Sequence, residues 1–170
     1  MPLLFALCVP INVSAYFTTN QAAYKIDDTH AVFVLEYKFG HKDNDMYLPM
    51  LTERDLLFKN KKRDRVGYTL RTRTGEVTHE GATQGLVLSS APIVDGMYKL
   101  EKGKVHKLWL VVALTTEKDL TASKYALQVE KLPFLMGKDA LRLQKLQLNP
   151  SELQYYVTPN VKLGTVVNNQ

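Results

Sequence analysis

Hydrophobic and polar residues alternate along several stretches of this chain with the period of a β-strand. In AVFVLEYKF (31–39), every second residue from Phe33 to Phe39 is apolar, and the charged residues fall on the opposite face. RVGYTLRTR (65–73) and SKYALQVEK (123–131) repeat the pattern. Each stretch therefore predicts a strand with one buried face.

Turn-forming residue pairs separate the predicted strands: Asp27-Asp28, Thr74-Gly75, Asp95-Gly96 and Lys102-Gly103. Residues 97–101 and 104–116 flank Gly103 and predict a hairpin. The second of these segments is apolar on both faces from Leu108 to Leu114, which predicts a central strand covered on both sides, with Trp109 in the core. A surface that faces a partner is the alternative.

One short helix is expected, from Thr52 to about residue 58. Thr52 can cap it, Asp55 completes a capping box, and Leu51 and Leu56 fit a hydrophobic staple.

Residues 139–148 combine helical propensity with a leucine spacing that fits a strand bulged at Gln144-Lys145. We favour the strand. About eight to ten short strands with frequent turns predict an all-β, antiparallel β-sandwich with one short helix. The 170 residues suffice for one such domain.

A stretch near the C-terminus resembles a known family. Leu148-Asn149-Pro150-Ser151-Glu152, followed by Tyr155-Tyr156, is similar to the L-x-P-x-D…YY segment that precedes the penultimate strand of immunoglobulin domains. Glu152 stands at the Asp position, Tyr156 at the corner tyrosine and Thr158 at the cysteine. The resemblance implies an Ig-like, Greek-key fold, with a final strand at 161–167, and no function. The layout also resembles small exported bacterial Ig-like domains of unknown function.

The first fifteen residues carry no charge and end in the small residues Val13-Ser14-Ala15. This pattern predicts a signal peptide at 1–15, although no Lys or Arg precedes its apolar run; a first buried strand is the alternative. The domain would then be 16–170. No run reaches the about 20 apolar residues of a transmembrane helix.

Cys8 is the only cysteine and lies in the predicted signal peptide. The mature chain would therefore contain no disulfide, no Cys-ligated zinc and no thiol nucleophile. An exported domain without disulfides suits a bacterial envelope.

The charge distribution is uneven. Seven bases and the single acid Asp64 give residues 59–73 a local charge of +6 in a chain of +5. The bases are Lys59, Lys61, Lys62, Arg63, Arg65, Arg71 and Arg73. These residues predict a basic patch that contacts an anionic partner. The alternative is that they protect an edge strand from pairing with other chains.

Possible metal ligands gather in GHKDNDMYLPM (40–50): His41, Asp43, Asp45, Met46 and Met50. The two carboxylates suit Ca²⁺, although the EF-hand spacing is absent. Imidazole with thioether suits Cu(I). Asp and Asn are also typical of a turn between strands, so a loop without cofactor is the interpretation that we favour.

No G-x-S-x-G elbow, H-E-x-x-H helix, P-loop or dinucleotide fingerprint is present. The four histidines, His30, His41, His79 and His106, are far apart in the sequence. We therefore assign no catalytic residue and expect no enzyme. A hydrolase whose residues converge only on folding is the alternative.

The sequence thus favours an exported binding or structural module, periplasmic or at the cell surface. Its expected partner is an anionic envelope polymer or an acidic protein. Nucleic acid is not expected, because only Phe58 and Tyr68 flank the basic residues as stacking aromatics. A metal-binding sandwich that uses the 41–50 loop is the second hypothesis.

Overall fold

The structure is a computed structural model that describes residues 20–54, 64–117, 123–137, 144–145 and 157–164. All regular secondary structure in these ranges is β-strand. The strands are β1 (Asn20–Lys25), β2 (His30–Phe39), β3 (Met46–Pro49), β4 (Leu51–Arg54), β5 (Arg65–Thr72), β6 (Ala82–Ser89), β7 (Ile93–Val94), β8 (Met97–Leu100), β9 (His106–Thr115), β10 (Ser123–Lys131), β11 (Pro133–Met136), β12 (Gln144–Lys145) and β13 (Val161–Leu163).

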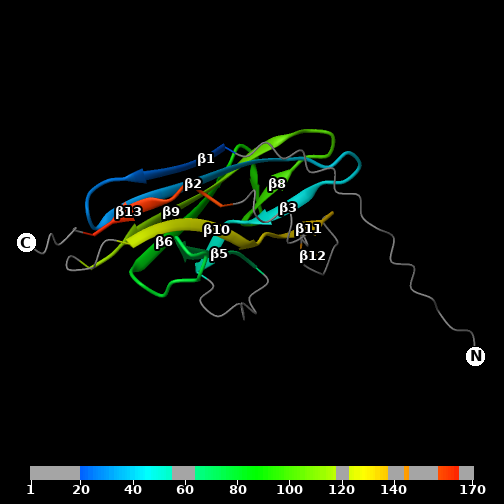
Figure 1. Cartoon of the computed structure of the whole chain (residues 1–170). Helices are drawn as coiled ribbons and strands as arrows, with labels where there is room; N and C mark the ends of the chain where they lie inside the picture. Colours follow the sequence, from blue (N-terminus) through cyan, green and yellow to red (C-terminus); the bar gives the residue numbers. More distant parts are fainter. Residues whose placement is uncertain (1–19, 55–63, 118–122, 138–143, 146–156, 165–170) are drawn as a thin grey trace, which may run out of the picture.

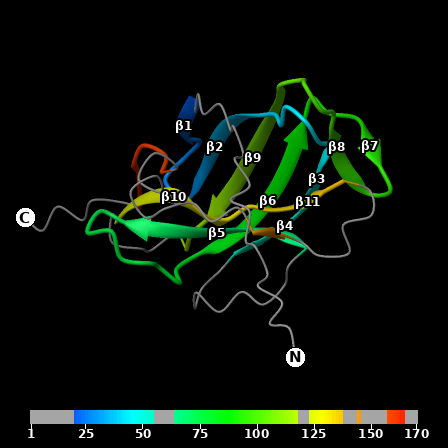
Figure 2. The same cartoon turned by 90° about the vertical axis from the view of Figure 1, so that its right-hand side faces the viewer.

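These strands form three sheets with the orders β1-β2-β9-β6, β13-β10-β5-β4 and β12-β11-β3-β8-β7. Paired strands are antiparallel, except that β4 runs parallel to β5. The first two sheets form the two layers of a sandwich (Figure 1). The third sheet lies at the end away from the β1–β2 turn (Figure 1), and Figure 2 views the molecule from that end. The predicted all-β sandwich is confirmed.

The alternating pattern of the sequence matches the core. On β2, Phe33, Leu35, Tyr37 and Phe39 are at most 2% exposed, while the residues between them are half-buried. Leu70 of β5 faces them from the other layer, in one cluster that includes residues of all three sheets. The alternation of apolar and polar residues therefore predicted the buried side of β2 correctly. The prediction of one buried face was wrong for the middle of β5 and β10, where residues on both faces are buried, including Thr69 and Gln128.

The prediction for 104–116 is half right. β9 is a central strand, paired with β2 on one edge and β6 on the other. Only one of its faces is covered, because Leu108, Leu110 and Val112 are buried whereas Trp109 is half-buried on the outer face. The indole N–H of Trp109 donates to Glu36 Oε2 at 3.1 Å. Placing Trp109 in the core was wrong.

The predicted hairpin of 97–101 and 104–116 is also wrong. The chain does turn at Gly103, where the Lys104 amide donates to the Glu101 carbonyl at 3.2 Å. The two flanking strands then enter different sheets, since β8 pairs with β3 and β7. This turn is a corner between sheets.

The helix expected from Thr52 does not form among the described residues. Leu51 to Arg54 form β4, and the Thr52 hydroxyl donates to the Gly85 carbonyl at 2.9 Å instead of capping a helix. The partner strand β5 and a carbonyl 33 residues away outweigh the local capping signal. Residues 55–58 lie outside the described residues.

The turn at Asp95-Gly96 is confirmed and joins β7 to β8. Both residues have positive φ, 52° and 74°, as a two-residue type I′ hairpin turn requires.

Three other sequence predictions fall wholly or partly outside the described residues. They are the signal peptide at 1–15, the immunoglobulin-like segment 148–156 and most of the strand at 139–148. Of the last, Gln144-Lys145 pair with β11 as β12. No described segment is a helix that could span a membrane.

Candidate anion-binding surface

The 41–50 loop is held together by contacts within the protein. His41 is 8% exposed, and its Nδ1 accepts the amides of Asp43 and Asn44 at 3.2 and 3.0 Å. Its carbonyl accepts the Gly103 amide at 2.8 Å. His41 therefore organises the turn that leaves β2.

Asp45 is tied to the neighbouring corner. Its Oδ1 accepts the Lys102 amide at 2.9 Å, and its Oδ2 lies 3.0 Å from Lys99 Nζ. The Lys102 amide, and then the Lys99 ammonium, hold the pKa of this carboxyl below its usual range. A metal at Asp45 would have to replace both contacts.

The two methionines of this loop pack in or against the hydrophobic core. Met46 is 1% exposed in the core, and Met50 packs against it. Asp43 alone of the predicted ligands is exposed. No group of three or more His, Cys, Asp or Glu side chains in the described part of the chain is placed to hold a metal. Calcium or copper binding here stays a prediction.

The predicted basic patch is described only in part. Lys59, Lys61, Lys62 and Arg63 lie outside the described residues. Arg65 and Arg71 lie on the face of β5 opposite the buried Val66 and Leu70, and Arg73 lies in the turn that follows the strand.

Arg71 is already bound to protein groups. One guanidinium nitrogen lies 3.2 Å from Glu130 Oε1, and another donates to the Gly75 carbonyl at 2.6 Å. The Thr69 hydroxyl donates to the same Glu130 oxygen at 2.7 Å. Arg71 therefore joins β5 to β10 and is less free to bind a partner than its charge suggested.

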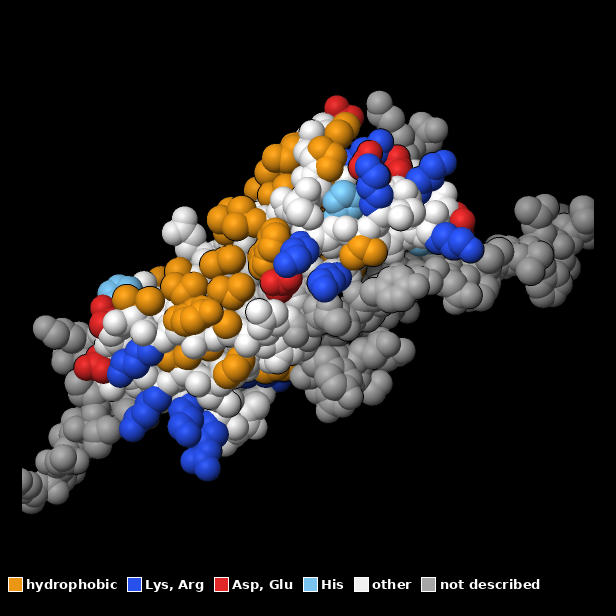
Figure 3. All heavy atoms as spheres, turned by 90° about the horizontal axis from the view of Figure 1, so that it is seen from above, with side chains coloured by type: hydrophobic (Ala, Val, Ile, Leu, Met, Phe, Trp, Pro, Cys, Tyr) orange, Lys and Arg blue, Asp and Glu red, His pale blue; other side chains and the backbone are white. Residues whose placement is uncertain are grey.

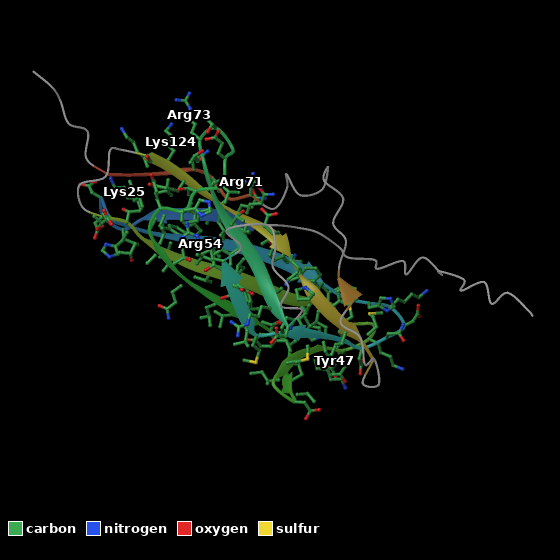
Figure 4. The ribbon with its side chains drawn as sticks, turned by 90° about the horizontal axis from the view of Figure 1, so that it is seen from below. Lys25, Tyr47, Arg54, Arg71, Arg73 and Lys124 are labelled. Carbon is green, nitrogen blue, oxygen red and sulfur yellow. The ribbon has the colours of Figure 1, made fainter. Side chains whose placement is uncertain are left out.

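Arg73 instead lies beside two bases from other strands, and we call Arg73, Lys124 and Lys162 the basic row. Lys124 of β10 and Lys162 of β13 are register partners. Arg73 directly follows Thr72, which is the last residue of β5 to pair with β10, and Figure 4 shows Arg73 and Lys124 at the same end of the sheet.

All three side chains of the basic row are exposed. Among the described residues, none of them lies within 4.0 Å of a carboxylate oxygen. Like charges directly opposite each other on paired strands destabilise a sheet. The row is thus a site where a bound anion would relieve repulsion.

Lys124 and Lys162 were not predicted as site residues, because neither has another base next to it in the sequence. The available signal was the polar face of 123–131, which begins with Lys124. Lys124 lies near Lys162 and Arg73 because of the order of the strands in the sheet. The alternation of apolar and polar residues does not specify this order.

Arg54 is a further basic residue with a structural role. Its guanidinium donates to the carbonyls of Gly81, Thr78 and Glu80 at 2.6, 2.9 and 2.9 Å. Burial lowers the pKa of Arg54. The side chain fixes the connection between β5 and β6.

His30 contacts a carboxylate and a hydroxyl, as a catalytic histidine would. However, Asp27 and the Thr29 hydroxyl both contact Nδ1, at 2.9 and 2.8 Å. In a triad, the acid and the nucleophile contact different ring nitrogens. The cluster lies in the exposed β1–β2 turn, and its contacts are those of a local Asx turn.

Two shallow hollows on the described surface, of about 250 and 120 Å³, share Met97 and Leu135 in their linings. Neither is lined by a histidine, serine or cysteine. The hydrolase hypothesis therefore gains no support from these hollows.

Comparison of the chain with protein-family models, with curated proteins and with solved structures finds no match.

Proposed function

We propose that this protein is a β-sandwich binding module that contacts an anionic partner through the basic row. The supporting observation is that Lys124 and Lys162 are paired on adjacent strands and Arg73 directly follows β5, the other neighbour of β10. All three are exposed and have no acidic neighbour among the described residues. The sheet fixes the backbone positions of Lys124 and Lys162, and binding would still have to order the exposed side chains.

The partner class follows from the shape of the site. The basic row lies on the outside of a sheet and is exposed along its length. An extended anionic polymer or an acidic segment of a protein can lie across such a row.

The proposal includes export and an Ig-like relationship. It is supported by the uncharged residues 1–15, by the absence of cysteine from 16–170 and by the sandwich itself. Thr158, at the cysteine position of the immunoglobulin pattern, is 4% exposed, and its hydroxyl accepts the Leu127 amide at 2.9 Å. We propose no catalytic activity.

The proposal is tested by measuring the affinity of the purified chain for polyglutamate by calorimetry. Affinity should fall as salt rises from about 0.05 to 0.15 M, because the contact is made between exposed charges. Lys124→Gln should weaken binding about fivefold, since one surface charge near a polyanion contributes about 1 kcal/mol.

Lys42→Gln is the matched control. Lys42 is an exposed lysine in the loop that follows β2, at the end of this strand away from the β1–β2 turn. Replacing it by Gln changes the net charge by the same amount as Lys124→Gln does. Equal weakening by both variants would show that only net charge matters and would reject the basic row as the site. Affinity that does not change with salt would reject the electrostatic mechanism.

A further inference from the structure

The outer face of the β1-β2-β9-β6 sheet is apolar, although it faces away from the core. One row crosses all four strands in register and consists of Ala22, Val34, Val111 and Leu86. Trp109 and Leu88 lie side by side in the next row. We call these six residues the apolar face. A sheet with one solvated face normally alternates apolar inside with polar outside, which this face does not.

Two residues of the apolar face are exposed and the other four are half-buried. Leu86 is 51% exposed and Leu88 is 42% exposed. Figure 3 shows hydrophobic side chains as a continuous band across this side of the molecule. Contiguous exposed apolar surface of this kind marks an interaction site.

The size of this sheet fits a protein interface. β2 and β9 are ten residues each, which corresponds to about 33 Å, and four strands span about 19 Å. Because β1 has six residues and β6 has eight, the sheet covers about 540 Å², compared with the roughly 800 Å² that each partner buries in a standard interface.

The charges at the two ends of the sheet indicate which partner fits. At the turn end, Lys25 stands against Asp27 and Asp28, a net charge of −1. At the other end, Lys38 and Lys107 stand against Glu36, a net charge of +1. The net charges of these two groups are therefore opposite in sign and complementary to each other.

We propose that the apolar face binds the apolar face of a second copy of this chain, in a two-fold dimer whose axis lies in the interface and across the strands. This axis places the turn end of one copy on the opposite end of the other, so that −1 meets +1 twice. The interface is isologous, and each residue enters it twice.

The test is sedimentation of the full chain between about 0.1 and 100 µM, the range in which a standard interface of modest affinity dissociates. A concentration-dependent dimer is expected. Leu86→Glu should weaken association about 100-fold, because burying each carboxylate in place of an apolar side chain costs at least a factor of ten and the dimer contains two.

Leu51→Glu is the matched control, because Leu51 is 54% exposed on a strand of the other layer. This substitution adds the same charge as Leu86→Glu. It should leave the dimer intact. A chain that stays monomeric to 100 µM, or equal effects of the two variants, would overturn the proposal. Monomers that bind neutral lipid vesicles through Leu86 would assign the face to a lipid surface and overturn it as well.

Two further measurements identify the face and its orientation. Trp109 is the only tryptophan, so dimerisation should shift its emission to the blue and protect it from acrylamide. Lys38→Glu should weaken the dimer. Adding Asp28→Lys should restore it, because the proposed axis places the turn end of one copy against the Lys38 end of the other. A dimer that leaves Trp109 emission unchanged uses another surface and refutes the assignment.

Discussion

Gly85 of β6 lies where one layer of the sandwich meets the edge of the other, and replacing it by Ala tests this contact. A Cβ at this position would lie 2.7 Å from Thr52 Oγ1 and 2.8 Å from Tyr68 Cε1. Both neighbours are held in place, Thr52 by its bond to the Gly85 carbonyl and Tyr68 by a 3.1 Å bond from its hydroxyl to Thr83. Neither can move away without losing a hydrogen bond.

The expected cost follows from these contacts. Inserting a methyl group into a packed site costs about 1–3 kcal/mol. Rotating Thr52 away adds about 1 kcal/mol for the lost hydrogen bond. Gly85→Ala should therefore lower the free energy of unfolding by about 2–4 kcal/mol, a large part of the roughly 5–15 kcal/mol of a typical domain.

Urea unfolding followed by tryptophan fluorescence measures this free energy. Gln84→Ala, on the exposed face of the same strand, is the control and should stay within about 0.5 kcal/mol of the parent. Thr52→Ala removes the nearest crowding atom. The double variant should therefore lose about 1 kcal/mol less than the sum of the single losses. Strict additivity, or a Gly85→Ala protein as stable as the parent, would refute the crowding argument.

Two other predictions concern stability. Arg54→Lys should lower the free energy of unfolding by about 2 kcal/mol, because an ammonium cannot reach all three carbonyls that the guanidinium holds. Thermal unfolding measures this loss. An equal loss in Arg73→Lys would contradict the reasoning. Burial lowers the pKa of His106 from 6.5, and its Nε2 accepts the Glu101 amide at 3.3 Å. The unfolded chain then binds more protons than the folded one below pH 6.5, so stability should fall as the pH drops from 6.5. This slope should decrease in His106→Gln and persist in His79→Gln, measured by urea midpoints from pH 7.5 to 5; an identical slope in His106→Gln would remove His106 as its cause.

Strand faces were predictable from the sequence, whereas strand partners were not. Alternation placed Phe33 and Leu70 in the core because a residue's face depends only on its neighbours in the chain. The partner of a strand depends on residues far away. The Gly103 turn is equally compatible with a hairpin and with a corner between sheets.

The basic patch illustrates the same limit. A run of bases in the sequence cannot show that Arg71 would be bound to Glu130, 59 residues away. It also cannot show that Lys124 and Lys162 would join Arg73. Similarly, the two apolar faces of β9 look alike in the sequence, and only the packing decides that Trp109 faces outward.

The pairing of β2 with β9 has a consequence for the synthesis of this protein. Residues 30–39 pair with residues 106–115 along their full length, so one edge of β2 has no partner until β9 leaves the ribosome. Residues 40–105 lie between them, and translation at about 5–20 residues per second takes roughly 3–13 s to cross that distance. During this interval the growing chain carries a ten-residue apolar strand with an open edge, which favours aggregation. The yield of folded protein should therefore depend on how well the nascent chain is shielded during these seconds.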